Sequence, residues 1–224
     1  MAARIQKPVP KRFSSSPVAI LERDKRLRTL LAQEAARIMA DDNVADFQMA
    51  KRKAAQRLGV STTRNLPANQ EIEQALQEYQ RLFQAGSQPD ILRQHRETAL
   101  DVMRLFSQFE PRLVGPVLAG TAGQHSEIEL HLYTDTAESI QLFLMHQHIP
   151  YESCERRVQF KRGEYQMQPA FRFVAGDEQV LLMVFSTDST RQPPLSQVDG
   201  RPVQRADMVA LETLLGQAAP DEFL

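Results

Sequence analysis

The hydrophobic period of the chain changes near residue 110, and this change limits the possible folds more than any other feature. Before it, apolar residues recur three and four positions apart, which places them on one face of a helix. From Arg112 onward, short apolar runs are separated by turn residues, as is typical of strands. The sequence therefore predicts an α+β protein in which an N-terminal helical region is followed by a small mixed sheet with flanking helices.

Four helices are expected before the first strand. The first begins at Pro17, with Ser16 as its cap, and ends near Met39. The second, "FQMAKRKAAQRL", starts after Asp46 and stops at Gly59. A third ends at Gly86 and a fourth begins after Pro89. Residues 1–16 are rich in Pro, Ser and basic residues, so we predict a flexible basic tail (1–16), a helical region (17–110) and an α/β domain (111–224).

Five segments after residue 110 have the pattern of strands: "RLVGPVLAG", "SEIELHLYT", "YESCERRVQF", "PAFRFVAG" and "EQVLLMVFST". Pro116 in the first of them suggests an edge position or a bulge, because proline cannot donate to a sheet ladder. A helix is expected between the second and third strands, over "TAESIQLFLMHQHI", and another closes the chain over "QRADMVALETLLGQ".

Composition indicates an ordinary globular protein. The 224 residues are 42% apolar, which is enough for one substantial core with a helical appendage. The most apolar run, "QVLLMVFST", is far shorter than a membrane span, and the N-terminus lacks an apolar secretory segment. The one cysteine, Cys154, excludes an internal disulfide and is expected to be a structural thiol. We therefore expect a cytoplasmic protein that does not associate with membranes.

Charge is distributed unevenly along the chain. Residues 1–64 contain 14 Lys and Arg against 6 Asp and Glu, whereas the other 160 residues contain 13 against 22. The second helix concentrates this positive charge in Lys51, Arg52, Lys53 and Arg57. Such a helix can bind nucleic acid or an acidic protein partner. It can equally dock on the acidic half of the same chain, or be a solvated surface.

The stretch "VLAGTAGQHSEIELHLYTD" carries the clearest chemical motif. Because strand side chains alternate between faces, His125, Glu127, Glu129 and His131 are expected to share one face, opposite Ile128 and its apolar neighbours. Carboxylate oxygens on a rigid strand can hold Mg²⁺, which in turn can bridge phosphate oxygens. The preceding Gly120, Thr121 and Gly123 would let backbone N–H groups approach a phosphate.

These residues resemble the core of the nucleotidyltransferase superfamily, to which DNA polymerase β belongs. That family has a Gly-Ser or Gly-Gly step on a turn after its first strand, followed by an acidic-apolar-acidic triplet on the next strand. Gly120-Thr121 and Glu127-Ile128-Glu129 are similar to these two elements over roughly residues 112–190. The resemblance implies that Glu127 and Glu129 are catalytic metal ligands for Mg²⁺. It further implies that Gly120, Thr121 and Gly123 bind a nucleoside triphosphate.

The family also places a third carboxylate on a later strand. Here neither "FRFVAG" nor "VLLMVFS" offers one, and Asp188 lies just beyond the strand. Two classes of function therefore stay open. The first is a Mg²⁺-dependent nucleotidyltransferase. The second is a non-catalytic binding protein that uses the basic helix to engage nucleic acid or an acidic protein partner.

A second resemblance covers most of the chain. The segments "AKRKAAQRLG", "NLPANQEIEQALQEYQRLF" and "PRLVGPVLAG" resemble short proteobacterial proteins whose automated name is that of the UDP-N-acetylmuramate–alanine ligase. Ligases of that kind use a phosphate loop that ends in Gly-Lys-Thr or Gly-Lys-Ser. No Gly-Lys pair occurs in this sequence, so the resemblance does not imply ligase activity.

Overall fold

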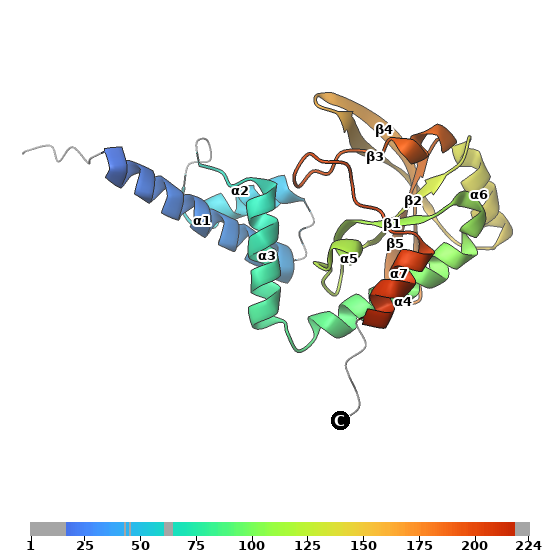
Figure 1. The fold of residues 1–224 in the computed structure, drawn as a ribbon, viewed down its shortest axis with the longest axis horizontal. Coiled ribbons are helices and arrows are strands. Elements are labelled where there is room, and N and C mark those ends of the chain that lie inside the picture. The colour runs from blue at the N-terminus through green and yellow to red at the C-terminus, as the bar shows by residue number, and fades with distance from the viewer. Residues whose placement is uncertain (1–16, 43, 45, 61–64, 218–224) are drawn as a thin grey trace, which may run out of the picture.

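A computed structural model describes residues 17–42, 44, 46–60 and 65–217. The expected flexible tail, residues 1–16, lies outside these residues. The described chain is α+β, as the change of hydrophobic period predicts: helices come first, and a five-stranded mixed sheet with helices follows from residue 112 (Figure 1).

The first three helices form a bundle with its own core. They are α1 (Pro17–Asp41), α2 (Phe47–Arg57) and α3 (Asn69–Phe83). Asp46 caps α2 as predicted, since its Oδ1 accepts a hydrogen bond of 2.6 Å from the Met49 backbone N–H. Leu31, Ile38 and Ile72 are among the buried core residues that these helices share. Between Leu21 and Leu30 no side chain of α1 is buried, although Arg28 pairs with Glu71 of α3. The N-terminal end of α1 extends beyond α2 and α3 (Figure 1).

The sheet has the strand order β1-β2-β5-β4-β3. Its strands are β1 (Arg112–Val114), β2 (Ile128–Tyr133), β3 (Glu152–Lys161), β4 (Glu164–Ala175) and β5 (Glu178–Phe185). β2 and β5 pair in parallel, and the other three pairs are antiparallel, so the sheet is mixed as predicted. β3 and β4 form a long hairpin. The β4–β5 pairing begins at Ala170, so the first part of β4 pairs with β3 alone.

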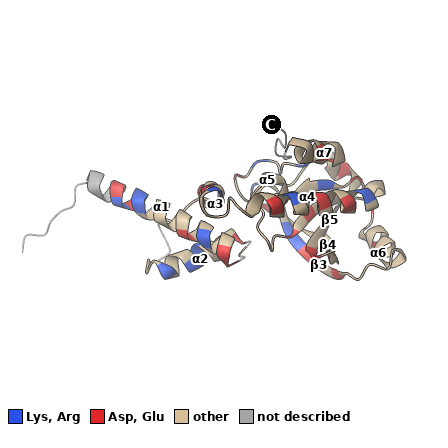
Figure 2. Ribbon diagram, turned by 90° about the horizontal axis from the view of Figure 1, so that it is seen from below, with Lys and Arg blue, Asp and Glu red and all other residues tan. Residues whose placement is uncertain are grey.

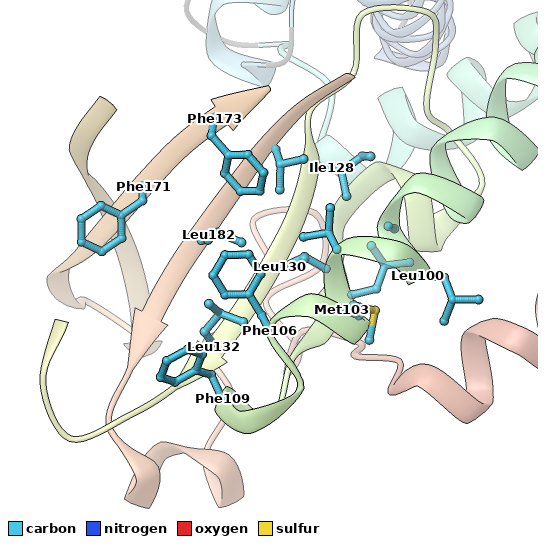
Figure 3. Close-up of a cluster of buried hydrophobic side chains, with 14 of the residues drawn as sticks. Leu100, Met103, Phe106, Phe109, Ile128, Leu130, Leu132, Phe171, Phe173 and Leu182 are labelled. Carbon is cyan, nitrogen blue, oxygen red and sulfur yellow. The ribbon is translucent and has the colours of Figure 1, made fainter. Parts of the chain in front are cut away.

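One face of the sheet carries the larger core. α4 (Gln88–Leu105), the 3₁₀ turn η1 (Ser107–Phe109), α6 (Ala137–His146) and α7 (Met208–Gln217) supply residues to it. Phe106 is fully buried, and its ring centroid lies 6.1 Å from that of Phe173 (Figure 3). The distance between the ring centroids of Phe106 and Phe143 is 5.0 Å. α4 therefore belongs to the core of the sheet, although the sequence groups it with the helices before residue 110. The boundary between the two hydrophobic cores therefore lies between α3 and α4.

The opposite face has a smaller apolar cluster formed by Val114, Tyr133, Ala170, Leu181, Met183 and Phe185. The segment after β5 begins with the 3₁₀ turn η2 (Thr187–Arg191) and then crosses toward the hairpin. There Leu195 forms a β-bridge with Gln159 of β3. This face is therefore covered by irregular chain rather than by helices.

The strand predicted over "RLVGPVLAG" is shorter than expected. β1 ends at Val114, and the next five residues form the short helix α5 (Gly115–Ala119). Gly115 begins α5 with a φ of 69°, in the left-handed region that favours glycine. Pro116 occupies the first turn of this helix rather than the strand, where a missing N–H has no cost, so it marks no bulge. The expected edge position is correct for β1, which is the first strand of the sheet.

Polar side chains of α3 connect the bundle to the rest of the chain, and Gln88 at the start of α4 contacts the same loop before β2. Gln80 donates a hydrogen bond of 2.9 Å to the Thr121 carbonyl, and Gln88 donates one of 2.9 Å to the Gly120 carbonyl. Asn69 at the start of α3 donates to the Gln197 carbonyl. Within the described ranges, no helix is both long enough and apolar enough to cross a membrane.

Candidate functional site

The two glutamates of the predicted motif lie beside one another. Glu129 is in β2, and Glu127 comes immediately before that strand. Ile128, Leu130 and Leu132 point into the larger core, so Glu129 and His131 point to the opposite face, as the alternation predicts. His125 does not share this position, because it lies in an exposed turn before β2. The prediction of one shared face therefore fails for His125.

Glu127 forms ion pairs with two arginines that the sequence analysis did not single out. The Arg172 Nε of β4 donates a hydrogen bond of 2.6 Å to its Oε1, and the Arg156 Nη2 of β3 lies 3.6 Å from its Oε2. Arg172 also reaches Glu152, at 3.7 Å. The hydrogen bond to Glu127 raises the pKa of Arg172, so this cation is permanent. Glu127 is therefore neutralised within the protein.

Glu129 has a different environment. Its carboxyl group lies against Gly115, where an added Cβ would come within 2.9 Å of Cδ and Oε2. Burial, together with the nearby charge of Glu127, raises the pKa of Glu129 to about 7, although Arg156 acts in the opposite direction. No ion pair or hydrogen bond to this carboxyl group occurs among the described residues. Near neutral pH, Glu129 therefore holds a proton for a large part of the time.

His131 is also unsuited to bind an ion. It is 2% exposed, and its ring lies 4.4 Å from that of Phe185, measured between centroids. Burial, with a smaller effect from Arg205, lowers the pKa of His131 to about 3. Its Nδ1 is buried and has no hydrogen-bond partner in the described part of the chain. The imidazole is therefore a neutral packing residue.

The position expected for a third carboxylate is occupied by other residue types. The strand register places Leu181 of β5 opposite Glu129, and Arg172 of β4 opposite Leu181. Asp188 lies in η2, beyond the far end of β5. Across the described ranges, no group of three His, Cys, Asp or Glu side chains is arranged to hold a metal ion. With Glu127 paired to two arginines, and with no third carboxylate or histidine placed beside Glu127 and Glu129 among the described residues, this site does not fit Mg²⁺.

The glycine-rich segment makes bonds within the protein. The N–H groups of Gly120 and Thr121, which follow α5, both donate to the carbonyl of Pro116 in its first turn. The Gly123 N–H donates to Ser126 Oγ at 2.9 Å. Each of the three N–H groups predicted to bind a phosphate thus has an internal partner. In this structure, Gly120 and Thr121 connect the sheet to α3 and α4.

The turn directly after β1 is Gly115-Pro116, five residues before Gly120-Thr121. Gly115 is the glycine that faces Glu129, and the sequence analysis missed it because the segment resembled a continuous strand. Pro116 was a usable signal, because proline is common in the first turn of a helix.

The cations of the basic helix α2 are largely matched by acidic residues of α1 and of the turn that follows it. Arg57 contacts Asp42 at 2.7 Å and Glu34 at 3.2 Å, and Lys53 Nζ lies 3.9 Å from Asp42. Lys51 is 7% exposed, and burial lowers its pKa. Of the four cations predicted to bind a partner, Arg52 alone is exposed without an acidic group within 4.0 Å among the described residues.

The comparisons with known proteins found no relative. No family model matches the chain, and neither the curated proteins nor the solved structures contain a significant match. The fold defines an α+β protein with a five-stranded mixed sheet, and any functional assignment must be argued from the residues themselves.

Proposed function

We propose that the chain is a non-catalytic binding protein that keeps a nucleotidyltransferase-like sheet as a scaffold and binds nucleic acid through the free end of α1. The observation that carries the first part is the 2.6 Å hydrogen bond from Arg172 to Glu127, with Arg156 on the other carboxylate oxygen. Two arginines supply the positive charge that a metal ion would supply in an enzyme. The Glu127 carboxylate is thus balanced without a metal ion.

The second part concerns the basic residues that lack internal partners. Arg23, Lys25 and Arg26 are exposed on the part of α1 that extends beyond α2 and α3 (Figure 2). Within the described residues, Arg23 and Lys25 have no acidic group within 4.0 Å, and Arg26 has only Glu22, at 4.0 Å. Residues 1–30 contain eight Lys and Arg against two Asp and Glu. A basic N-terminal segment of this kind suits a polyanion such as nucleic acid.

Reversing the three charges in the variant Arg23→Glu/Lys25→Glu/Arg26→Glu is expected to weaken binding of single-stranded RNA by about tenfold or more at low salt. The reason is that each phosphate contact releases condensed counterion. For the same reason, wild-type affinity should fall on the order of tenfold between low and physiological salt. Fluorescence anisotropy with a labelled oligonucleotide at two salt concentrations measures both effects. Thermal melting should hardly change, since these side chains are exposed.

The matched control is Arg81→Glu/Arg191→Glu/Arg201→Glu, which changes the net charge equally at exposed positions elsewhere. It should keep most of the affinity. Equal losses in the two triple variants would show a non-specific effect of net charge, and no binding by the wild type at low salt would reject the proposed function. Lys53→Glu gives a further contrast, because it breaks a contact with Asp42 and should lower stability instead.

A further inference from the structure

The distal part of the β3–β4 hairpin has one face that none of the described helices covers. Side chains of Phe171 and Phe173 pack into the larger core, but Met167 and Tyr165, on the same face of β4, are 54% and 51% exposed. On the opposite face of the hairpin, Val158 and Phe160 pack against the smaller core. The hairpin is therefore anchored on one face and open on the other.

The open face combines an aromatic ring with a guanidinium group. The strand register sets Arg157 opposite Met167, and Gln159 opposite Tyr165. Arg157 lies over the Tyr165 ring, with its Cζ 3.8 Å from the ring centroid. Two more cations, Lys161 and Arg162, are exposed at the turn of the hairpin. Glu164 partly balances Lys161, at 3.7 Å, whereas Arg162 has no acidic partner among the described residues.

We infer that this face of the hairpin, formed by Arg157, Tyr165 and Met167 with Arg162 at its turn, binds single-stranded nucleic acid. Unstacked bases pack on aromatic rings and on arginine planes, while nearby cations contact the phosphates. A protein partner would also use exposed Tyr and Met, but the cations at the turn match a phosphate backbone. The inference rests on the proposed nucleic-acid binding. It adds a site on which bases stack, separate from the end of α1 that is proposed to contact phosphates.

The hairpin arrangement favours single strands over duplexes. A base can stack on Tyr165 or Arg157 only when it is not held inside a helix of paired strands. The anchored face keeps the strands in place, so the exposed side chains need little further ordering when they bind. Affinity should therefore be greater for an unstructured oligonucleotide than for a duplex of the same length.

The test is fluorescence anisotropy with a labelled oligo(U) and a matched RNA duplex, at low salt, on the intact chain. Tyr165→Ala is expected to weaken oligo(U) binding by about tenfold, the loss typical of one stacked base. Tyr165→Phe keeps the ring and should retain most of the affinity. Val174→Ala, which trims another exposed side chain of β4, should have no effect.

The inference would be overturned if Tyr165→Ala bound oligo(U) as tightly as the wild type does. It would also be overturned if the wild type bound the duplex as tightly as oligo(U). If Tyr165→Ala does not fold, ultraviolet cross-linking of the wild type replaces it: cross-links at Tyr165 support the site, and cross-links confined to other segments contradict it. The two proposals fail separately. Loss of binding in the α1 triple variant with normal binding by Tyr165→Ala rejects the hairpin site alone, and the reverse result rejects the α1 site alone.

Discussion

Replacing Glu129 with glutamine is expected to stabilise the protein at pH 8, by about 1–3 kcal/mol, and to have little effect at pH 4. The pKa of Glu129 is raised from 4.5 to about 7 in the folded protein. As the pH rises above 4.5, the unfolded chain loses this proton while the folded chain keeps it, so the wild type loses stability until about pH 7. Glutamine removes that loss because it stays neutral at every pH.

Urea unfolding of wild type and Glu129→Gln at pH 4 and pH 8 measures the difference. Comparing the two chains at each pH cancels the contribution of His131, whose lowered pKa makes the protein less stable in acid. Glu155→Gln is the control, because Glu155 is an exposed carboxylate on the neighbouring hairpin and should change stability little. A destabilised Glu129→Gln at pH 8 would mean that Glu129 is ionised and bound to a cation.

Arg172→Met is expected to cost about 1–3 kcal/mol of unfolding free energy, because it leaves a partly buried Glu127 with the more distant Arg156 as its cation. Arg172→Met combined with Glu127→Gln should recover part of this loss, since the carboxylate that needed the cation is also removed. A double-mutant cycle should therefore give a coupling energy of about 1 kcal/mol or more between the two residues.

The Lys161–Glu164 pair at the turn of the hairpin is the matched control. Its side chains are 75% and 64% exposed, against 27% and 25% for Arg172 and Glu127. Solvent screens such a pair, so its coupling energy should lie below about 0.5 kcal/mol. Equal coupling energies in the two pairs would show that the Glu127–Arg172 contact contributes no more to stability than an exposed ion pair.

Hydrophobic spacing was sufficient to predict most of the elements. The helices that begin at Pro17 and after Asp46, and the strands around Ile128 and Leu181, lie where their patterns indicate. The segment after Val114 was misread, because "GPVLAG" is too short and too apolar for its period to separate helix from strand. The assignment of α4 to the sheet core was also missed, since a single amphipathic face does not specify which neighbour covers it.

The candidate site was predicted only in part. The two-residue spacing places Glu129 and His131 on one face and brings Glu127 close to them, because strand geometry alone determines this. Which cations reach Glu127 depends on the strand order, which places Arg172 of β4 next to Leu181 of β5 and so near the start of β2. Sequence spacing does not contain that information. The same holds for α2, because the sequence does not show that Arg57 contacts Glu34 of α1 and Asp42 directly after that helix.

Calorimetric titration of the wild-type chain with Mg²⁺, and then with ATP in the presence of Mg²⁺, tests most directly whether arginines have replaced the metal at the glutamate pair. Neither is expected to bind at millimolar concentration, because Arg172 and Arg156 already neutralise Glu127 and because burial raises the pKa of Glu129 to about 7, which disfavours its ionised form. Binding of Mg²⁺ or of its ATP complex that Glu127→Gln/Glu129→Gln abolishes would contradict this expectation.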